Sequence, residues 1–315
     1  FTSGGSESNN HAIIGAALAN AERGKHIITS RIEHPAVINT CRYLEDRLGF
    51  RVTYLPVDSY GLVNPEDVRR AIKRDTILIT VMHANNEVGT IEPIEEIGEI
   101  AKERGILLHT DAAQSCGKIE VNVNRLKADL LTLAGHKLYA PKGIGALFIR
   151  NGTQIDSLIH GAGQEKGRRA GTENVPYVVG LGVACDLARG TLPNYEKEVK
   201  FLRDRLQAKL EAGLGKGRVQ RNGHPEKRLP NTLNISIRGV VGEELLSQIP
   251  EVAASTGAAC HAGSTEPSSV LLEIGVNREL ALGALRLTLG RWSTEEEVNL
   301  AGELIVGRAK RPVTT

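Results

Sequence analysis

Short apolar runs alternate with longer stretches of helical spacing over the first half of the chain. The apolar runs are bounded by turn residues and predict strands at residues 26–29, 52–57, 76–82, 106–110, 129–134 and 145–149. Between them, apolar residues recur three or four positions apart and predict helices at residues 7–23, 35–48, 65–73 and 93–104. Strands that alternate with helices predict an α/β fold with a mostly parallel sheet and helices on both of its faces.

The pattern changes after Asn174. We expect a helix to about Leu187, then a long charged helix over residues 195–214, with a domain boundary near Pro193. Strand-like runs follow at residues 231–238, 252–255 and 284–289, and a last helix begins at Thr294. The predicted organisation is a large domain, residues 1–192, followed by a smaller C-terminal α+β domain, residues 193–315.

Composition narrows the class of protein. Of 315 residues, 41% are hydrophobic and 24% are charged, which is typical of a globular protein with a sizeable core. The net charge is only +2 and basic residues do not gather with aromatic ones, so we expect no nucleic-acid partner. No apolar run approaches the roughly 20 residues that span a bilayer, so we expect no membrane insertion.

The cysteines point to a reducing compartment. Cys41, Cys116, Cys185 and Cys260 lie far apart and form no Cys-x-x-Cys pair, which argues against a disulfide framework or a zinc site. A cytoplasmic location is the expectation. The first residue is Phe1, with no targeting segment in view, and we expect the natural chain to begin further upstream.

Three segments carry candidate chemistry. Glycines and serines at residues 2–6 precede a helix, where backbone N–H groups can bind an anion such as a phosphate. Asp111 ends one predicted strand and can hold a pyridinium nitrogen protonated. Lys137 follows another strand and can form a Schiff base. Singly, the loop is more often a plain helix cap, Asp111 is as consistent with capping a turn, and Lys137 does not differ from a surface lysine; in this order the three favour pyridoxal-phosphate chemistry on an aminotransferase-like fold.

The sequence resembles the cysteine desulfurases and selenocysteine lyases of the class V pyridoxal-phosphate enzymes over nearly its full length. The resemblance rests on ordered blocks at residues 2–10, 33–34, 85–89, 109–114, 135–137, 171–174, 228–232, 255–260 and 285–291. It implies a fold-type I enzyme, a pyridoxal 5'-phosphate cofactor and a homodimer. It also implies an N-terminal segment before Phe1 that completes the smaller domain and lines the active site.

The resemblance implies a role for each matching residue. Lys137 would carry the cofactor, Asp111 would pair with its pyridine nitrogen, Gln114 would contact its ring hydroxyl, and His34 would stack on the ring and shuttle a proton. Gly5, Ser6 and His136 would hold the phosphate, Asn86 would lie beside cofactor and substrate, Arg286 would bind the substrate carboxylate, and Thr172 would reach the phosphate of the neighbouring subunit.

Cys260 is the expected sulfur acceptor. It follows a stretch of small residues, Ser255 to Ala259, which suits a loop that brings a thiol to a ligand. The implied reaction converts L-cysteine to L-alanine and leaves a persulfide on Cys260 for delivery to an acceptor such as an iron–sulfur scaffold protein.

The sequence is also consistent with other substrates and reactions. L-Selenocysteine is the alternative substrate, since both substrates share this chemistry. A remoter alternative is another class V enzyme, which would not need Cys260, or an inactive shortened form. Ala134 and Lys166 depart from the serine and arginine common in the family, which predicts an altered cofactor affinity.

Overall fold

The computed structural model describes residues 1–257 and 266–310. The chain divides into two compact units. Unit 1 comprises Phe1–Val57, Leu62–Asn85 and Glu92–Leu192, and unit 2 comprises Asp58–Gly61, Asn86–Ile91 and Pro193–Thr315. Each unit is described by itself below.

Unit 1 is built on a six-stranded sheet. The strand order is β2-β1-β3-β4-β5-β6; all neighbouring pairs are parallel except β5 with β6. The strands are β1 (His26–Ser30), β2 (Arg51–Leu55), β3 (Thr76–Thr80), β4 (Leu107–Asp111), β5 (Leu130–Ala134) and β6 (Gly145–Ile149). The helices of this unit are α1 (Gly5–Asn10), η1 (His11–Gly15), α2 (Ala16–Ala19), α3 (Pro35–Leu48), α4 (Pro65–Ala71), α5 (Ile94–Glu103), η2 (Gly135–Leu138) and η3 (Gln164–Gly167).

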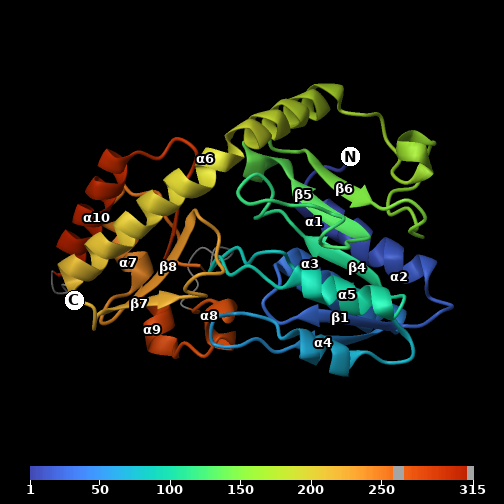
Figure 1. Ribbon diagram of the computed structural model, residues 1–315, viewed down its shortest axis with the longest axis horizontal. Coiled ribbons are helices and arrows are strands. Elements are labelled where there is room, and N and C mark those ends of the chain that lie inside the picture. Colours follow the sequence, from blue (N-terminus) through green and yellow to red (C-terminus); the bar gives the residue numbers. More distant parts are fainter. Residues whose placement is uncertain (258–265, 311–315) are drawn as a thin grey trace. The chain divides into compact units, whose positions relative to one another are not determined.

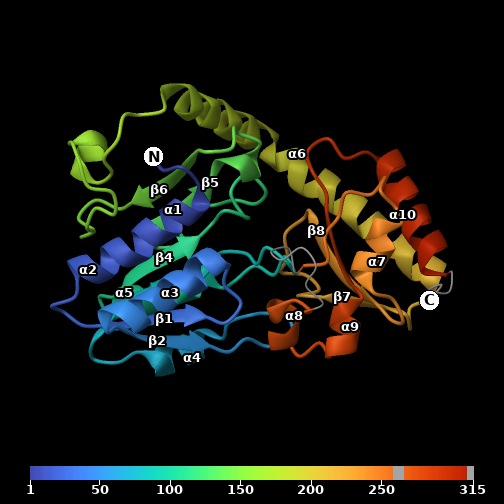
Figure 2. The same cartoon turned by 180° about the vertical axis from the view of Figure 1, so that it is seen from behind.

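Helices cover both faces of this sheet, as the alternation predicted. Successive strand residues point to opposite sides, so Ile27 and Leu78 join a core with η1, α2 and α3, whereas Ile28 and Ile79 join a second core with α4 and α5. Helices α4 and α5 lie in front of the sheet in Figure 1, and α1, α2 and α3 lie in front of it in the reverse view of Figure 2. The predicted α/β fold is confirmed.

Unit 2 contains a smaller antiparallel sheet with the order β7-β8-β9. Its elements are β7 (Val219–Asn222), β8 (Thr232–Ile237), α7 (Gly242–Ser247), α8 (Ser269–Glu273), α9 (Arg278–Leu282), β9 (Ala284–Thr288) and α10 (Glu295–Ala309). Thr294 caps α10, as expected, through a reciprocal pair of hydrogen bonds with Glu297.

Two predicted elements are wrong. The gap predicted between two helices, at residues 188–194, is absent, because α6 (Val175–Leu214) runs through it as one helix; the division between the two units nevertheless falls at Pro193, near the predicted domain boundary. Pro193 has no N–H group and so lacks one helical hydrogen bond. Buried side chains before and after it, such as Ala188 and Val199, pack against the protein and stabilise the continuous helix. Residues 252–255 form only a single bridge, from Ser255 to Arg286, because the N–H of Val252 is used in a turn with Ile249.

Candidate active site

The ends of β4 and β5 bring the two central candidates to one edge of the sheet. Asp111 is the last residue of β4, and η2, which carries His136 and Lys137, begins directly after β5. The strands are parallel, with Asp111 paired to Thr132, so both ends lie on the same side. His136 and Lys137 are both exposed residues.

Asp111 is a buried carboxyl group with neutral partners. Its Oδ1 accepts the N–H of Ala113 at 2.9 Å and its Oδ2 accepts the side-chain amide of Asn9 at 2.7 Å. Burial raises the pKa of Asp111, although these hydrogen bonds and the proximity of His34 and Lys137 act to lower it. A cation beside Asp111 would counter that shift. Asn9 was not predicted; the only sequence signal is its place one helical turn after Ser6.

His34 caps the start of α3 and stands within electrostatic reach of Asp111 and Lys137. Its Nδ1 accepts the N–H of Ala36 at 3.1 Å, so the neutral ring carries its proton on Nε2. Burial lowers the pKa of His34, which keeps the imidazole neutral. A neutral ring that can take up or release a proton is therefore held at this edge.

The glycine-containing loop before α1 offers free backbone donors. The first N–H groups of a helix have no partner inside it, and in α1 these belong to Gly5, Ser6 and Glu7. A Cβ on Gly5 would stand 3.1 Å from the Cβ of Ala134, so this loop packs against the end of β5. An anionic group fits here, next to the segment that carries His136 and Lys137.

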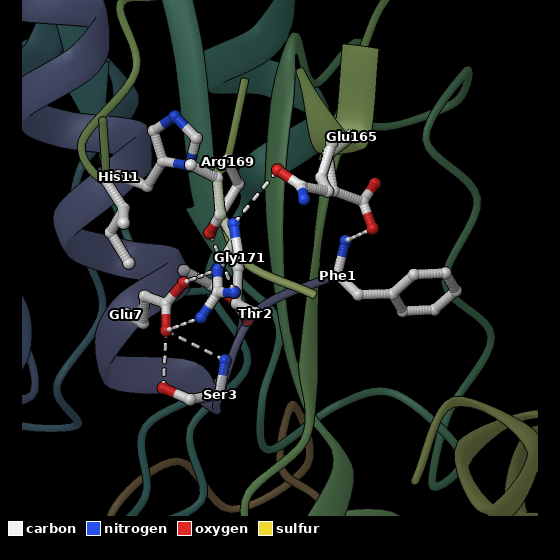
Figure 3. Close-up of polar contacts among 12 residues, drawn as sticks. Phe1, Thr2, Ser3, Glu7, His11, Glu165, Arg169 and Gly171 are labelled. Atoms are coloured by element: carbon white, nitrogen blue, oxygen red, sulfur yellow. Dashed lines mark hydrogen bonds and ion pairs between the residues drawn. The ribbon is translucent and has the colours of Figure 1, made fainter. Parts of the chain in front are cut away.

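An ion pair joins this loop to the segment that carries Thr172. Glu7 Oε1 accepts Nε of Arg169 at 2.9 Å, and Glu7 Oε2 accepts the backbone N–H of Ser3 at 2.9 Å, as Figure 3 shows. Burial acts to raise the pKa of Glu7, but the hydrogen bonds from Arg169 and Ser3 outweigh it and lower that pKa. The exposed Thr172 lines a pocket with Thr2, Ser3 and Arg169.

Unit 2 contains the remaining candidates. Nη1 of Arg286 donates to the carbonyl oxygen of Asn86 at 3.2 Å, so these two residues lie together. Both are half-buried, and the backbone of Arg286 bridges to Ser255. Cys260 lies outside the described residues.

The residues of unit 1 fit pyridoxal phosphate. A buried carboxyl without a cationic hydrogen-bond partner suits a pyridinium nitrogen, the loop at Gly5 suits a phosphate, and an exposed amine stands at Lys137. Among residues 1–257 and 266–310, no group of His, Cys, Asp and Glu side chains could hold a metal ion. No helix in the described part of the chain has the length and apolar character needed to cross a membrane.

Comparison with known proteins agrees with this arrangement. The family model Aminotransferase class-V matches residues 1–300. The chain is 52% identical over 307 residues to Cysteine desulfurase IscS of Methanosarcina thermophila, covering 97% of this chain and 75% of that protein. It is 51% identical over 301 residues to Cysteine desulfurase IscS of Dictyoglomus turgidum, covering 95% and 76%.

Solved structures show the same likeness. A NifS-like protein matches with a TM-score of 0.89 and 38% identity, over 97% of this chain and 80% of that one. SspA in complex with cysteine matches with a TM-score of 0.78 and 40% identity, over 93% and 81%. The chain therefore belongs to the aminotransferase class-V family and, within it, to the pyridoxal-phosphate-dependent cysteine desulfurases.

Proposed function

We propose that this chain converts L-cysteine to L-alanine, with pyridoxal 5'-phosphate carried on Lys137, and that it transfers the sulfur to Cys260. The observation that carries the proposal is the meeting of a buried Asp111 and an exposed Lys137 at one sheet edge, in a chain whose relatives are cysteine desulfurases. A solved relative that binds cysteine supports the substrate.

Unit 1 would hold the cofactor and move the first proton. Bound pyridoxal phosphate supplies an electron sink for the bonds around the substrate α-carbon. We assign the pyridine nitrogen to Asp111, the ring hydroxyl to Gln114, and the phosphate to Gly5, Ser6 and His136, with Thr172 serving the partner subunit. The Lys137 amine would take the α-proton, and His34 would stack on the ring and pass a proton through Nε2.

Unit 2 would bind the substrate and take its sulfur. Arg286 offers a planar fork that suits a carboxylate, and Asn86 lies beside it. The Cys260 thiolate would attack the substrate sulfur, forming an S–S bond as the C–S bond breaks. The electron pair of the C–S bond stays with carbon, which takes up a proton and becomes the methyl group of alanine.

The test is to replace Cys260 and follow two signals. Cys260→Ala should keep the visible absorbance band of the lysine-bound cofactor and lose cysteine-dependent alanine formation. Cys185→Ala, at a half-exposed thiol of unit 1, is the matched control and should keep both. Alanine formation that survives Cys260→Ala would show a different class V reaction, and a wild-type protein without the band would reject the cofactor assignment.

L-Selenocysteine remains the second candidate substrate, because the sequence blocks at residues 171–174 and 228–232 are similar to those of selenocysteine lyases. We expect the ratio kcat/KM to favour L-cysteine. Alanine formation from each substrate, measured with the same enzyme preparation, decides between them.

We propose a homodimer that uses one face of α6. Val175, Val179, Val183 and Leu187 recur every four residues, and each is more than half exposed, at 53–61%. The opposite face of the same segment, with Leu181, Ala184 and Ala188, is buried in the core of unit 1. When a helix has apolar side chains on two faces, both faces are normally buried. A second copy of the chain, as the resemblance implies, would bury the exposed face of α6.

Sedimentation velocity tests this interface. The double substitution V179E/V183K should convert the protein to a monomer while far-UV circular dichroism stays unchanged, since both side chains point outward. Tyr43→Lys, at an exposed position of α3, is the control and should leave the dimer intact. A dimer that survives V179E/V183K would place the interface elsewhere.

The sulfur would pass from Cys260 to an acceptor protein such as an iron–sulfur scaffold. The described cysteines Cys41, Cys116 and Cys185 are free thiols, as is typical of proteins in a reducing compartment. We therefore also propose a cytoplasmic location.

A further inference from the structure

Lys118 is a buried lysine of unit 1 with an unusual environment. The residue is only 8% exposed, and its ammonium group donates to two oxygens of Gln114, the backbone carbonyl at 2.8 Å and Oε1 at 3.2 Å. Within residues 1–257 and 266–310, no carboxylate forms an ion pair with it. Burial, together with the charge of Lys137, lowers the pKa of Lys118 to about 8. A buried ammonium without a carboxylate partner costs stability, so a role in function would explain it.

The ammonium group decides which way the Gln114 amide points. The two ends of a glutamine amide have nearly the same shape, so hydrogen-bond partners must distinguish them. An ammonium can only donate, so it requires Oε1 on its side and leaves the Nε2 amino group for other contacts. In the described residues that amino group has no hydrogen-bond acceptor, and Gln114 is only partly buried.

The position of Gln114 makes this orientation useful. It lies three residues after Asp111 in the turn that leaves β4, and the N–H of the intervening Ala113 binds the Asp111 carboxylate. The turn is further closed by the N–H of Ser115 and of Cys116, which both donate to the carbonyl of Ala112. Gln114 is therefore held on the same turn as the group assigned to the pyridine nitrogen.

We propose that Lys118 is a positioning residue that holds Gln114 with its amino group toward the cofactor, where it donates to an anionic ring oxygen. This inference rests on the proposed function. Lys118 touches neither cofactor nor substrate; it acts through Gln114. The Nε2 amino group of Gln114 can only donate hydrogen bonds. It therefore favours a deprotonated ring oxygen, which can only accept them, over a hydroxyl, whose hydrogen would point at another donor.

Cofactor binding, measured without turnover, tests the proposal. Apo-enzyme is titrated with pyridoxal phosphate while the visible band is recorded. Lys118→Met removes charge and donors at similar length and should weaken binding roughly tenfold. Gln114→Ala should weaken it by a similar factor and shift the band in the same direction. The double variant should bind no more weakly than Gln114→Ala alone, because the lysine acts through the glutamine.

Two further variants make the result specific. Gln114→Glu keeps an acceptor for Lys118 and removes the amino group, so it should preserve the melting temperature and weaken cofactor binding even if Lys118→Met folds poorly. Lys102→Met, at an exposed lysine of α5, should bind as the wild type does.

The outcomes separate this inference from the proposed function. Wild-type affinity in Lys118→Met or in Gln114→Glu overturns the inference, as do effects of Lys118→Met and Gln114→Ala that multiply in the double variant. A wild-type protein that shows no visible band rejects the proposed function instead.

Discussion

The two units bury different kinds of polar side chain in their sheets. In unit 1, His26 lies between Thr76 and Thr53, and His109 lies between Thr80 and Thr132, with ring-to-hydroxyl distances of 2.7–3.1 Å. In unit 2, the corresponding network contains amides and a hydroxyl: Asn222 donates to Asn234 at 2.8 Å and to Ser236 at 2.9 Å. Histidines can change their charge near neutral pH and amides cannot.

This difference predicts how the stability of each unit responds to acid pH. Burial lowers the pKa of His109 to about 3 and that of His26 to about 4, so both rings are neutral in the folded protein. The unfolded chain takes up these protons below pH 6.5. The stabilising contribution is therefore complete above pH 6.5 and is lost as pH falls toward the folded-state values. Unit 1 should be sensitive to acid in a way that the sheet of unit 2 is not.

Substitutions at Lys137 and Arg286 should separate cofactor chemistry in unit 1 from substrate binding in unit 2. Lys137→Ala in unit 1 should abolish the visible band and lower alanine formation by roughly 10³-fold, because it removes both the cofactor attachment and the base. Arg286→Ala in unit 2 should keep the band and raise KM for cysteine roughly tenfold or more, because it removes only carboxylate binding. Absorbance spectra and steady-state kinetics measure both.

Arg238→Ala, at an exposed arginine of unit 2, is the control for loss of positive charge and should leave KM unchanged. Loss of the band in Arg286→Ala would contradict the assignment of Arg286 to the substrate carboxylate alone, since it would show that the cofactor also depends on Arg286.

The next effect tests the amide network of unit 2. Asn222→Ala leaves Asn234 Oδ1 and Ser236 without their shared donor, which should lower the free energy of unfolding of this unit by about 2 kcal/mol. The loss should be the same at pH 7.5 and pH 5.5. Hydrogen exchange of β8 peptides, compared with wild type at each pH, measures it; a loss that grows at acid pH would show a titrating group in the network.

A smaller, pH-dependent effect is expected at His109. Because folded His109 resists protonation, lowering the pH from 6.5 to 5.5 should reduce the free energy of unfolding of the wild type. This reduction should exceed that of His109→Asn, which has no proton to gain, by at most about 1.4 kcal/mol. Urea unfolding at the two pH values measures the difference. Because the variant is compared with wild type, other titrating groups cancel. Parallel pH dependences in the two proteins would show that His109 is not the source.

The smallest effect compares two helix caps. Thr294 exchanges two hydrogen bonds with Glu297 at the start of α10 in unit 2, whereas Asn64 accepts one, from Glu66, at the start of α4 in unit 1. Thr294→Ala should cost about 1 kcal/mol and Asn64→Ala no more than that. Thermal melting of each variant measures the costs. Thr294→Ser retains the hydroxyl and should melt as wild type does; equal losses in Thr294→Ser and Thr294→Ala would attribute the effect to packing.

The elements of unit 1 were the more predictable ones. The predicted helix at residues 35–48 and the strand at 145–149 have the bounds found for α3 and β6. Pro35, Gly49 and the apolar spacing all act on neighbouring residues, so the signal is local. In unit 2, β7 was not predicted, since its residues Val219–Asn222 contain one apolar side chain, and its pairing with β8 is a property of the sheet.

The order of residues along the chain is enough to predict the class of chemistry and the edge of the sheet where it occurs. Asp111 ends one parallel strand and Lys137 lies just after the next, and the ends of parallel strands meet on one side of a sheet, so their proximity follows from order along the chain. The side chains that support these two residues become apparent only in the folded chain. Asn9 reaches Asp111 across 102 residues and Arg169 reaches Glu7 across 162. Lys118 is close to Gln114 in sequence, but its burial without a carboxylate depends on everything packed around it. Periodicity records which face of an element is buried, whereas the partners of a buried polar group are set by segments that meet only when the chain folds.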